Sequence, residues 1–117
     1  IKHITMARTT YYDPKDLKKF GDISKWDAEL GKAFFDYYGK VFAEGALTER
    51  EKSLIALAVA HAIQCPYCID AYTQDTMAKG CDEEQMMEAI HVAAAIRGGA
   101  SLVHGTQMMN KFKDLTM

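Results

Sequence analysis

Apolar residues recur at helical spacing through the first half of the chain. Between residues 26 and 41, bulky side chains follow one another at steps of four, four, three and four, at Trp26, Leu30, Phe34, Tyr37 and Val41. A period of 3.6 residues places all five on one side of a helix, so this stripe is expected to face a core. No alternating strand pattern and no hairpin dipeptide occurs anywhere, which predicts an all-α fold.

Capping residues predict where two of the helices begin. Asp13-Pro14 pairs a capping side chain with a proline at the first helical position, which predicts a short helix over 14–20 that Gly21 ends. Thr48-Glu49-Arg50-Glu51 matches the capping box, in which Thr and Glu satisfy the first free backbone donors of a helix. A helix from Glu49 to about Gln64 is therefore expected.

A proline predicts a break between two helices in the middle of the chain. Pro66 cannot continue the preceding helix, so the break falls on Cys65 and Pro66 opens a new helix that runs to Gly80. The preceding helix is apolar on nearly every side from Leu54 onward. It is therefore expected to be a central helix surrounded by others.

The remaining sequence predicts two further helices. Asp82 is a capping residue that opens a helix to about Arg97, after which Gly98-Gly99 either breaks or closely packs the chain. A last helix is expected to carry Leu102 and Phe112. Gly45 is expected to end the helix that bears the first apolar stripe. These segments together predict a bundle of about six helices.

Length, composition and charge exclude several classes of protein. The chain has 117 residues, of which 49% are hydrophobic, and this suits a single domain over residues 1–117. Because 14 basic residues face 16 acidic ones, nothing favours binding to nucleic acid or to an anionic membrane. The longest strongly apolar stretch, Leu54 to Ile63, is far shorter than the roughly 20 residues that span a bilayer.

The cysteines carry the strongest chemical signal. Two of the three form the motif Cys65-Pro66-Tyr67-Cys68, and Cys81 stands alone in an expected loop, where an exposed thiol without a partner is predicted. An odd number of cysteines does not make a disulfide scaffold. A single C-x-x-C in a chain that can build its own core indicates redox or metal chemistry in the cytoplasm.

The C-x-x-C motif falls at the expected start of a helix. Two cysteines three residues apart on a first turn bring their sulfurs close together, and the positive end of the helix dipole stabilises a thiolate. Cys65, at the cap, should feel this field most, and Cys68 should be more buried. His61 lies four residues before Cys65 and is a candidate base or cationic partner for a thiolate.

A zinc site is the alternative to redox chemistry. His61, Cys65 and Cys68 supply three candidate ligands, and a tetrahedral site needs a fourth from His91, His104 or Asp70. His91 and His104 stand among alanines and valines, where a histidine in a core or an interface is expected. A non-catalytic module that binds zinc or an arsenical through the two thiols therefore stays open as a second function.

Two long segments resemble a known family. The run LTEREKSLIALAVAHAIQCPYCIDAYTQDTMAKG and the later run AIHVAAAIRGGASLVHG closely resemble the carboxymuconolactone decarboxylase superfamily, in its alkylhydroperoxidase D-like (AhpD-like) branch. The runs YYDPKDLKKFGDI and FFDYYGKVFAEGAL further resemble a subgroup known as arsenosugar biosynthesis-associated peroxidase-like proteins. The resemblance covers most of the chain.

The resemblance implies a fold, an assembly and an activity. It implies a helical AhpD-like bundle that forms a homotrimer or homohexamer and acts as a thiol peroxidase or disulfide reductase without a bound cofactor or metal. It assigns attack on a hydroperoxide to Cys68 and resolution to Cys65, whereas the helix field favours a thiolate on Cys65. An external dithiol is then needed to reduce the disulfide. Lactone decarboxylation is less expected, because the decarboxylases generally lack this C-x-x-C.

The chain departs from the family pattern at two positions of its proton relay. The family has a glutamate twelve residues before the first cysteine and a histidine four after the second, and Ser53 and Tyr72 stand there in this chain. We therefore expect His61 to replace the missing histidine, with Glu51 or Tyr72 assisting. Glu51 is also explained as the carboxylate of the capping box.

Overall fold

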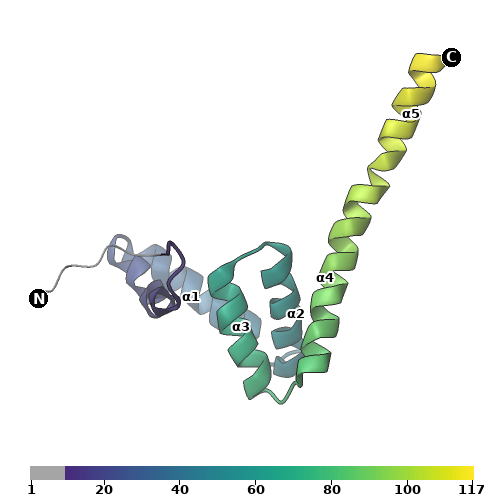
Figure 1. Cartoon of the computed structure of the whole chain (residues 1–117). Helices are drawn as coiled ribbons and strands as arrows, with labels where there is room; N and C mark the ends of the chain where they lie inside the picture. The colour runs from purple at the N-terminus through teal and green to yellow at the C-terminus, as the bar shows by residue number, and fades with distance from the viewer. Residues whose placement is uncertain (1–9) are drawn as a thin grey trace, which may run out of the picture.

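The computed structural model describes residues 10–117, and this part of the chain is entirely helical (Figure 1). A 3₁₀ helix precedes five α-helices. The elements are η1 (Pro14–Lys25), α1 (Ala28–Phe42), α2 (Glu49–Ala62), α3 (Pro66–Ala78), α4 (Glu83–Val103) and α5 (Gly105–Thr116). The expected all-α fold is thus confirmed. None of the described helices is long and apolar enough to cross a membrane.

The best-packed part of the molecule, which we call the hub, consists of α2, α3 and residues 83–97 of α4. α2 packs against α3 on one side and against α4 on another (Figure 1). Arg50 donates a hydrogen bond of 2.8 Å to Gln85 near the start of α2, and Arg97 donates one of 2.6 Å to the carbonyl of Ala62 at its end. α2 and α4 therefore run parallel, and their contact ends near Arg97.

All but one of the buried residues among 10–117 belong to the hub or to the connection between α3 and α4. They are Ser53, Leu57, Ala60, Thr76, Cys81 and Ala93, and the exception is Gly31 of α1. The predicted exposed thiol at Cys81 is therefore wrong, since this side chain is only 7% accessible. Of the two positions expected for His91 and His104, a core or an interface, the core is wrong, because both side chains are exposed in the single chain; the interface stays a prediction.

The predicted helix starts are confirmed by their caps. The Glu51 N–H donates to the Thr48 hydroxyl and the Thr48 N–H donates to the Glu51 carboxylate, which completes the capping box of α2. Asp82 and Gln85 form the same arrangement at the start of α4. These reciprocal bonds satisfy backbone donors that a helix start otherwise leaves unpaired.

The predicted helix ends at Gly21 and Gly45 are wrong, and the break that was one of two alternatives for Gly98-Gly99 does not occur. η1 continues through Gly21 to Lys25, α1 ends at Phe42 before Gly45, and α4 passes through Gly98-Gly99 without a break. Gly80 alone among the described glycines has a positive φ, of 84°. The other glycines keep ordinary backbone angles, so they do not reverse the chain. The C-terminal break falls instead at His104, which leaves Leu102 on α4.

The stripe expected to face a core from α1 lies mostly in solvent. Trp26, which precedes α1, is 84% exposed, and Leu30 and Tyr37 are 69% and 66% exposed. The neighbouring stripe of Phe35, Tyr38 and Phe42 makes the contacts instead, as a row of aromatic rings toward η1 and α3. Both stripes have helical spacing, so periodicity alone did not distinguish the packed one from the open one.

α2 is covered on two sides but not all round. Its third side carries Ile55, Val59 and Ile63, which are 49%, 49% and 64% exposed. The expectation of a helix surrounded by others is therefore wrong for the single chain. This open apolar side of α2 borders a groove that also reaches Cys68.

Candidate functional site

The two cysteines of the motif stand at the N-terminus of α3. Cys65 is the capping residue and Pro66 is the first residue of the helix, as predicted. The Cys68 N–H donates to the Cys65 sulfur over 3.3 Å, and the two sulfur atoms are 2.7 Å apart. Both cysteines are free and partly buried. The cap geometry therefore holds the two sulfurs side by side, in position for a disulfide to form without rearrangement of the backbone.

The two sulfurs differ in their electrostatic surroundings. Burial, together with the hydrogen bond to Cys65, raises the pKa of Cys68 to about 11. The Cys65 sulfur accepts a backbone N–H at the positive end of a helix, which stabilises negative charge on it. Cys68 therefore keeps its proton at neutral pH, and the two sulfurs are not equivalent.

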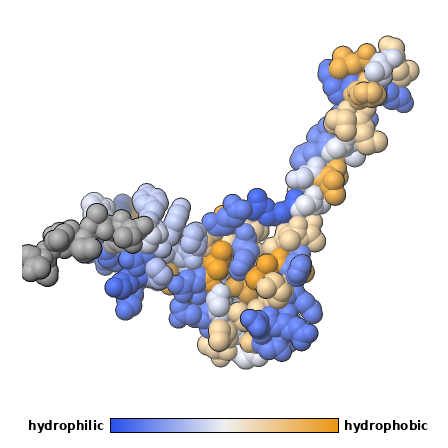
Figure 2. All heavy atoms as spheres, in the orientation of Figure 1, coloured by the Kyte–Doolittle hydropathy of each residue, from blue (hydrophilic) through white to orange (hydrophobic). Residues whose placement is uncertain are grey.

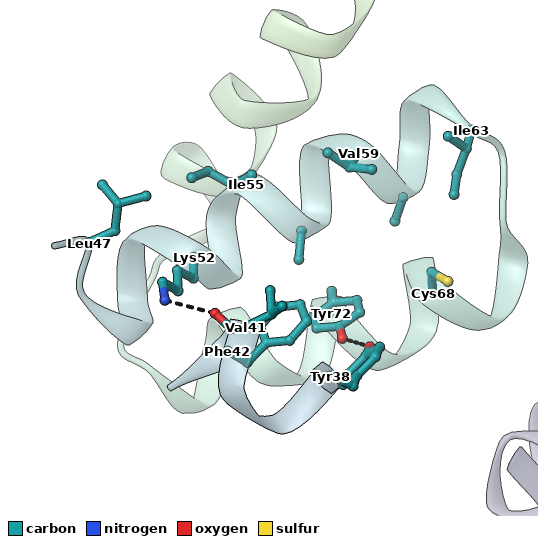
Figure 3. A pocket seen from close by; sticks show the side chains of 12 residues that line it. Tyr38, Val41, Phe42, Leu47, Lys52, Ile55, Val59, Ile63, Cys68 and Tyr72 are labelled. Carbon is teal, nitrogen blue, oxygen red and sulfur yellow. Dashed lines mark hydrogen bonds between the residues drawn. The ribbon is translucent and has the colours of Figure 1, made fainter. Parts of the chain in front are cut away.

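Two cavities meet at Cys68. One, of about 440 Å³, lies between η1 and α3 and also borders Cys65. The other, of about 380 Å³, is an apolar groove between α1, α2 and α3 (Figure 3). Cys68 lies at one end of this groove and Leu47 at the other. Small molecules can thus approach Cys68 from two sides and Cys65 from one.

Tyr72 is brought to the site, together with a residue that the sequence did not single out. The hydroxyls of Tyr38 on α1 and Tyr72 on α3 are hydrogen-bonded to each other, and both residues line both cavities (Figure 3). Burial raises the pKa of Tyr38, and the negative charges of Cys68 and Asp75 add to this rise. The available signal for Tyr38 was the spacing of Phe35, Tyr38 and Phe42, which marks the packed side of α1.

His61 is held by its own helix. Its Nδ1 atom lies 2.8 Å from the Leu57 carbonyl, and since a carbonyl only accepts, Nδ1 must donate. The Nε2 atom is then the nitrogen that can accept a proton. Within residues 10–117, neither cysteine sulfur is hydrogen-bonded to this ring. A role for His61 as the base of the site thus stays a prediction.

Glu51 and Ser53 are occupied elsewhere. Glu51 accepts the Thr48 N–H in the capping box, and this bond lowers the pKa of its carboxyl. Ser53, which stands where the family relay has its glutamate, is fully buried and donates to the Arg50 carbonyl over 2.7 Å. Neither residue lines the two cavities at Cys68. Both side chains are therefore accounted for by their hydrogen bonds at the start of α2.

The ligands proposed for zinc are not assembled. Among residues 10–117, no group of three or more His, Cys, Asp or Glu side chains is arranged to hold a metal ion. His61, Cys65 and Cys68 thus do not form a metal centre within one described chain. His104 bonds instead to Gln107 over 2.8 Å at the start of α5.

Comparison with known proteins identifies the family. The profile of the carboxymuconolactone decarboxylase family matches residues 28–111. A Paracoccus denitrificans protein, described as uncharacterized protein 4 in the cox locus, is 43% identical over 96 residues, which cover 82% of this chain and 86% of that protein. The match spans the C-x-x-C region and both capping boxes.

Two solved structures have similar folds. A protein from Methanobacterium thermoautotrophicum superposes with a TM-score of 0.71 at 31% identity, covering 74% of this chain and 97% of that one. An apo carboxymuconolactone decarboxylase family protein from Legionella pneumophila superposes with a TM-score of 0.66 at 28% identity, covering 89% and 94%. With the family match over most of its length, this chain belongs to the carboxymuconolactone decarboxylase family.

Proposed function

We propose that the protein is a thiol-dependent peroxidase of the alkylhydroperoxidase type, which acts through Cys65 and Cys68. Family membership alone leaves both peroxidases and decarboxylases open. The observation that favours the peroxidase is the pair of free sulfurs 2.7 Å apart at a helix N-terminus, reached by cavities on two sides. A paired dithiol of this kind suits two-electron oxidation to a disulfide.

In the proposed mechanism, a proton moves between the two sulfurs before the hydroperoxide is attacked. Cys68 borders both cavities but has a raised pKa, so attack by Cys68 requires that its proton pass to the Cys65 sulfur across the short sulfur–sulfur contact. The Cys68 thiolate then attacks the terminal oxygen of a hydroperoxide. The O–O bond breaks, Cys68 becomes a sulfenic acid, and the Cys65 thiol returns the proton to the departing alkoxide.

The second half of the cycle forms the disulfide. The Cys65 thiolate attacks the Cys68 sulfur and displaces hydroxide, which takes a proton from solvent to give water. Overall, two thiols and one hydroperoxide give a disulfide, an alcohol and water. An external dithiol then reduces the disulfide by exchange, which restores both thiols. No resident cofactor takes part in these steps.

Tyr72 and His61 have proposed supporting roles. Tyr72 stands one turn after Cys68, and its bond to Tyr38 fixes the direction of its hydroxyl beside the cavities. We infer that it donates a hydrogen bond to the bound peroxide. His61 offers Nε2 as a proton acceptor on the neighbouring helix. Glu51 is assigned to the cap and takes no part in the chemistry.

The experiment is a peroxide assay with matched cysteine variants. The reduced protein should consume about one hydroperoxide per pair of thiols and form a Cys65–Cys68 disulfide that mass spectrometry detects. Cys68→Ser should abolish the consumption. Cys65→Ser removes both the proton acceptor and the resolving thiol, so it should react more slowly, and the sulfenic acid that forms on Cys68 should persist and be trapped by dimedone. Cys81→Ala is the control that retains the pair, and its turnover should be unchanged.

Two results would contradict this function. Peroxide consumption that survives in Cys68→Ser would remove the proposed nucleophile. Protein that forms no disulfide with any hydroperoxide, but binds one trivalent arsenical per thiol pair, would favour the non-catalytic module, since two neighbouring sulfurs also suit such a ligand. A link to arsenic metabolism, implied by the resembling subgroup, is measured in the same arsenical titration.

A further inference from the structure

The C-terminal part of the chain has no core of its own. Residues 98–116, which we call the arm, comprise the end of α4 and all of α5 and project away from the hub (Figure 1). The radius of gyration is 20.2 Å, whereas a compact domain of this length has about 13 Å. Among the described elements, α5 packs only against α4. Within residues 10–117, no element other than α4 packs closely against α5.

The arm nevertheless presents a regular apolar side. Met108, Phe112 and Leu115 follow at helical spacing on α5 and are 63%, 66% and 74% exposed. Figure 2 shows apolar residues along the arm and at its tip. An amphipathic helix of 12 residues with such a stripe has the pattern of a helix that docks into an apolar groove.

The hub has a groove that matches this description. The apolar groove at Cys68 is walled by α1 and α2 side chains that remain open to solvent, among them Val41, Ile55 and Val59. Its lining is almost entirely apolar, with Lys52 as its one charged residue (Figure 3). Lys52 is already bonded to the carbonyls of Val41 and Ala43. The groove thus offers an apolar surface without free charge.

We propose that α5 of a second copy of this chain lies in the apolar groove and closes it beside Cys68. The chain's own α5 is carried away from the groove by the continuous helix α4 (Figure 1). Pairing of two arms with each other would cover Phe112 but leave Ile55, Val59 and Ile63 in water. Docking of the arm into the groove removes both apolar surfaces from water with one contact, which the hydrophobic effect favours.

In this docked arrangement, α5 of the partner forms part of the site at Cys68. Because Cys68 lies at one end of the groove, the partner's helix would restrict approach to Cys68 to the second cavity, which Cys68 shares with Cys65. The site of one chain is then complete only when another chain is bound. The inference concerns this contact and holds whichever reaction the cysteines perform.

Photo-crosslinking of the full-length chain tests the contact directly. A benzophenone amino acid in place of Phe112 should crosslink to peptides that contain Ile55, Val59 or Ile63. Mixing isotope-labelled and unlabelled protein should show that the linked peptides come from different copies. The same amino acid at Asn110, which lies on the opposite side of α5, is the control and should give few such products.

A substitution measures the strength of the same contact. Phe112→Asp should raise the dissociation constant of the assembly at least about thirtyfold, because it places a carboxylate where the proposed contact buries an aromatic ring. It should also speed alkylation of Cys68 by iodoacetamide, while Asn110→Asp should change neither. Retained helical circular dichroism shows that the variant is folded.

Two outcomes would overturn the proposal. One is a protein that sediments as a monomer at every concentration, and the other is crosslinking from position 112 to α5 of another copy instead of the groove. Neither readout involves peroxide turnover. A failure of the docking contact is therefore distinguishable from a failure of the proposed peroxidase activity.

Discussion

The hub and the arm are both helical, but they are stabilised by different contacts. In the hub, side chains such as Leu57 and Thr76 are fully buried, and both capping boxes begin hub helices. In the arm, no described residue is buried and α5 begins after His104 without a side-chain cap. The hub is therefore stabilised by contacts within one chain. The arm's helix is regular, but among residues 10–117 no element other than α4 packs closely against it.

The largest effect is expected when the hub loses its central side chain. Leu57 is 1% exposed on α2, so Leu57→Ala should lower the free energy of unfolding by about 2–5 kcal/mol through lost burial and a residual cavity. Leu115→Ala removes the same atoms from a side chain that is 74% exposed. Urea unfolding of both variants at several protein concentrations measures the difference.

The concentration dependence sharpens the contrast between the two regions. Leu57→Ala should destabilise the protein equally at every concentration, because its contacts lie within one chain. Leu115→Ala should have little effect on dilute monomer and a larger one where copies associate. An equal loss for both variants in dilute protein would show that the arm packs within its own chain and would remove the distinction.

The fold of the hub was predictable because its signals are local. Thr48 with Glu51, and Asp82 with Gln85, fix two helix starts by bonds that span three residues. Pro66 fixes a third by a steric clash. Helix ends were less predictable, since Gly21 and Gly98 end a helix only where the chain reverses. The exposed stripe of α1 was misjudged because two neighbouring stripes of this helix have the same apolar spacing, and the spacing does not show which of them packs.

The candidate site was predictable as far as it lies within one motif. The adjacency of Cys65 and Cys68 follows from their separation on one helical turn, and the structure shows it. Tyr38 could not be placed, because its bond to Tyr72 joins residues 34 positions apart. The burial of Cys81 likewise depends on packing of the α3–α4 connection, on which a sequence pattern carries no information.

A smaller effect is expected from the partly buried thiol of Cys68 at alkaline pH. The pKa of Cys68 rises from its ordinary value of 9.0 to about 11 on folding. The protonated Cys68 thiol therefore contributes its full stabilisation below about pH 9. This contribution is lost as pH rises through about 11, where the thiol of the folded protein also ionises. A shift of this size corresponds to about 2.7 kcal/mol, and because solvent screens the partly buried thiol, the reduced protein should lose less stability than this across the window.

Comparison with a variant isolates this thiol from other groups that titrate at the same pH. Tyr38, whose pKa is also raised, contributes a similar decline. Cys68→Ala should therefore show a shallower decrease in the urea midpoint between pH 8 and 11 than the reduced parent protein. Identical slopes would mean that Cys68 titrates as it does in the unfolded chain, which would contradict the raised pKa of Cys68 in the folded protein.

The smallest effect is expected at the start of α2, where it decides the role of Glu51. Thr48→Ala removes the hydroxyl that accepts the Glu51 N–H and should cost about 1 kcal/mol of stability. Glu51→Gln keeps a side-chain oxygen for the Thr48 N–H, so most of the cap should persist. If Glu51 acts only in the cap, peroxide turnover is unchanged in Glu51→Gln. A turnover reduced tenfold in a variant of parental stability would instead assign this carboxylate to the proton relay at His61, and would make the first turn of α2 part of the active site.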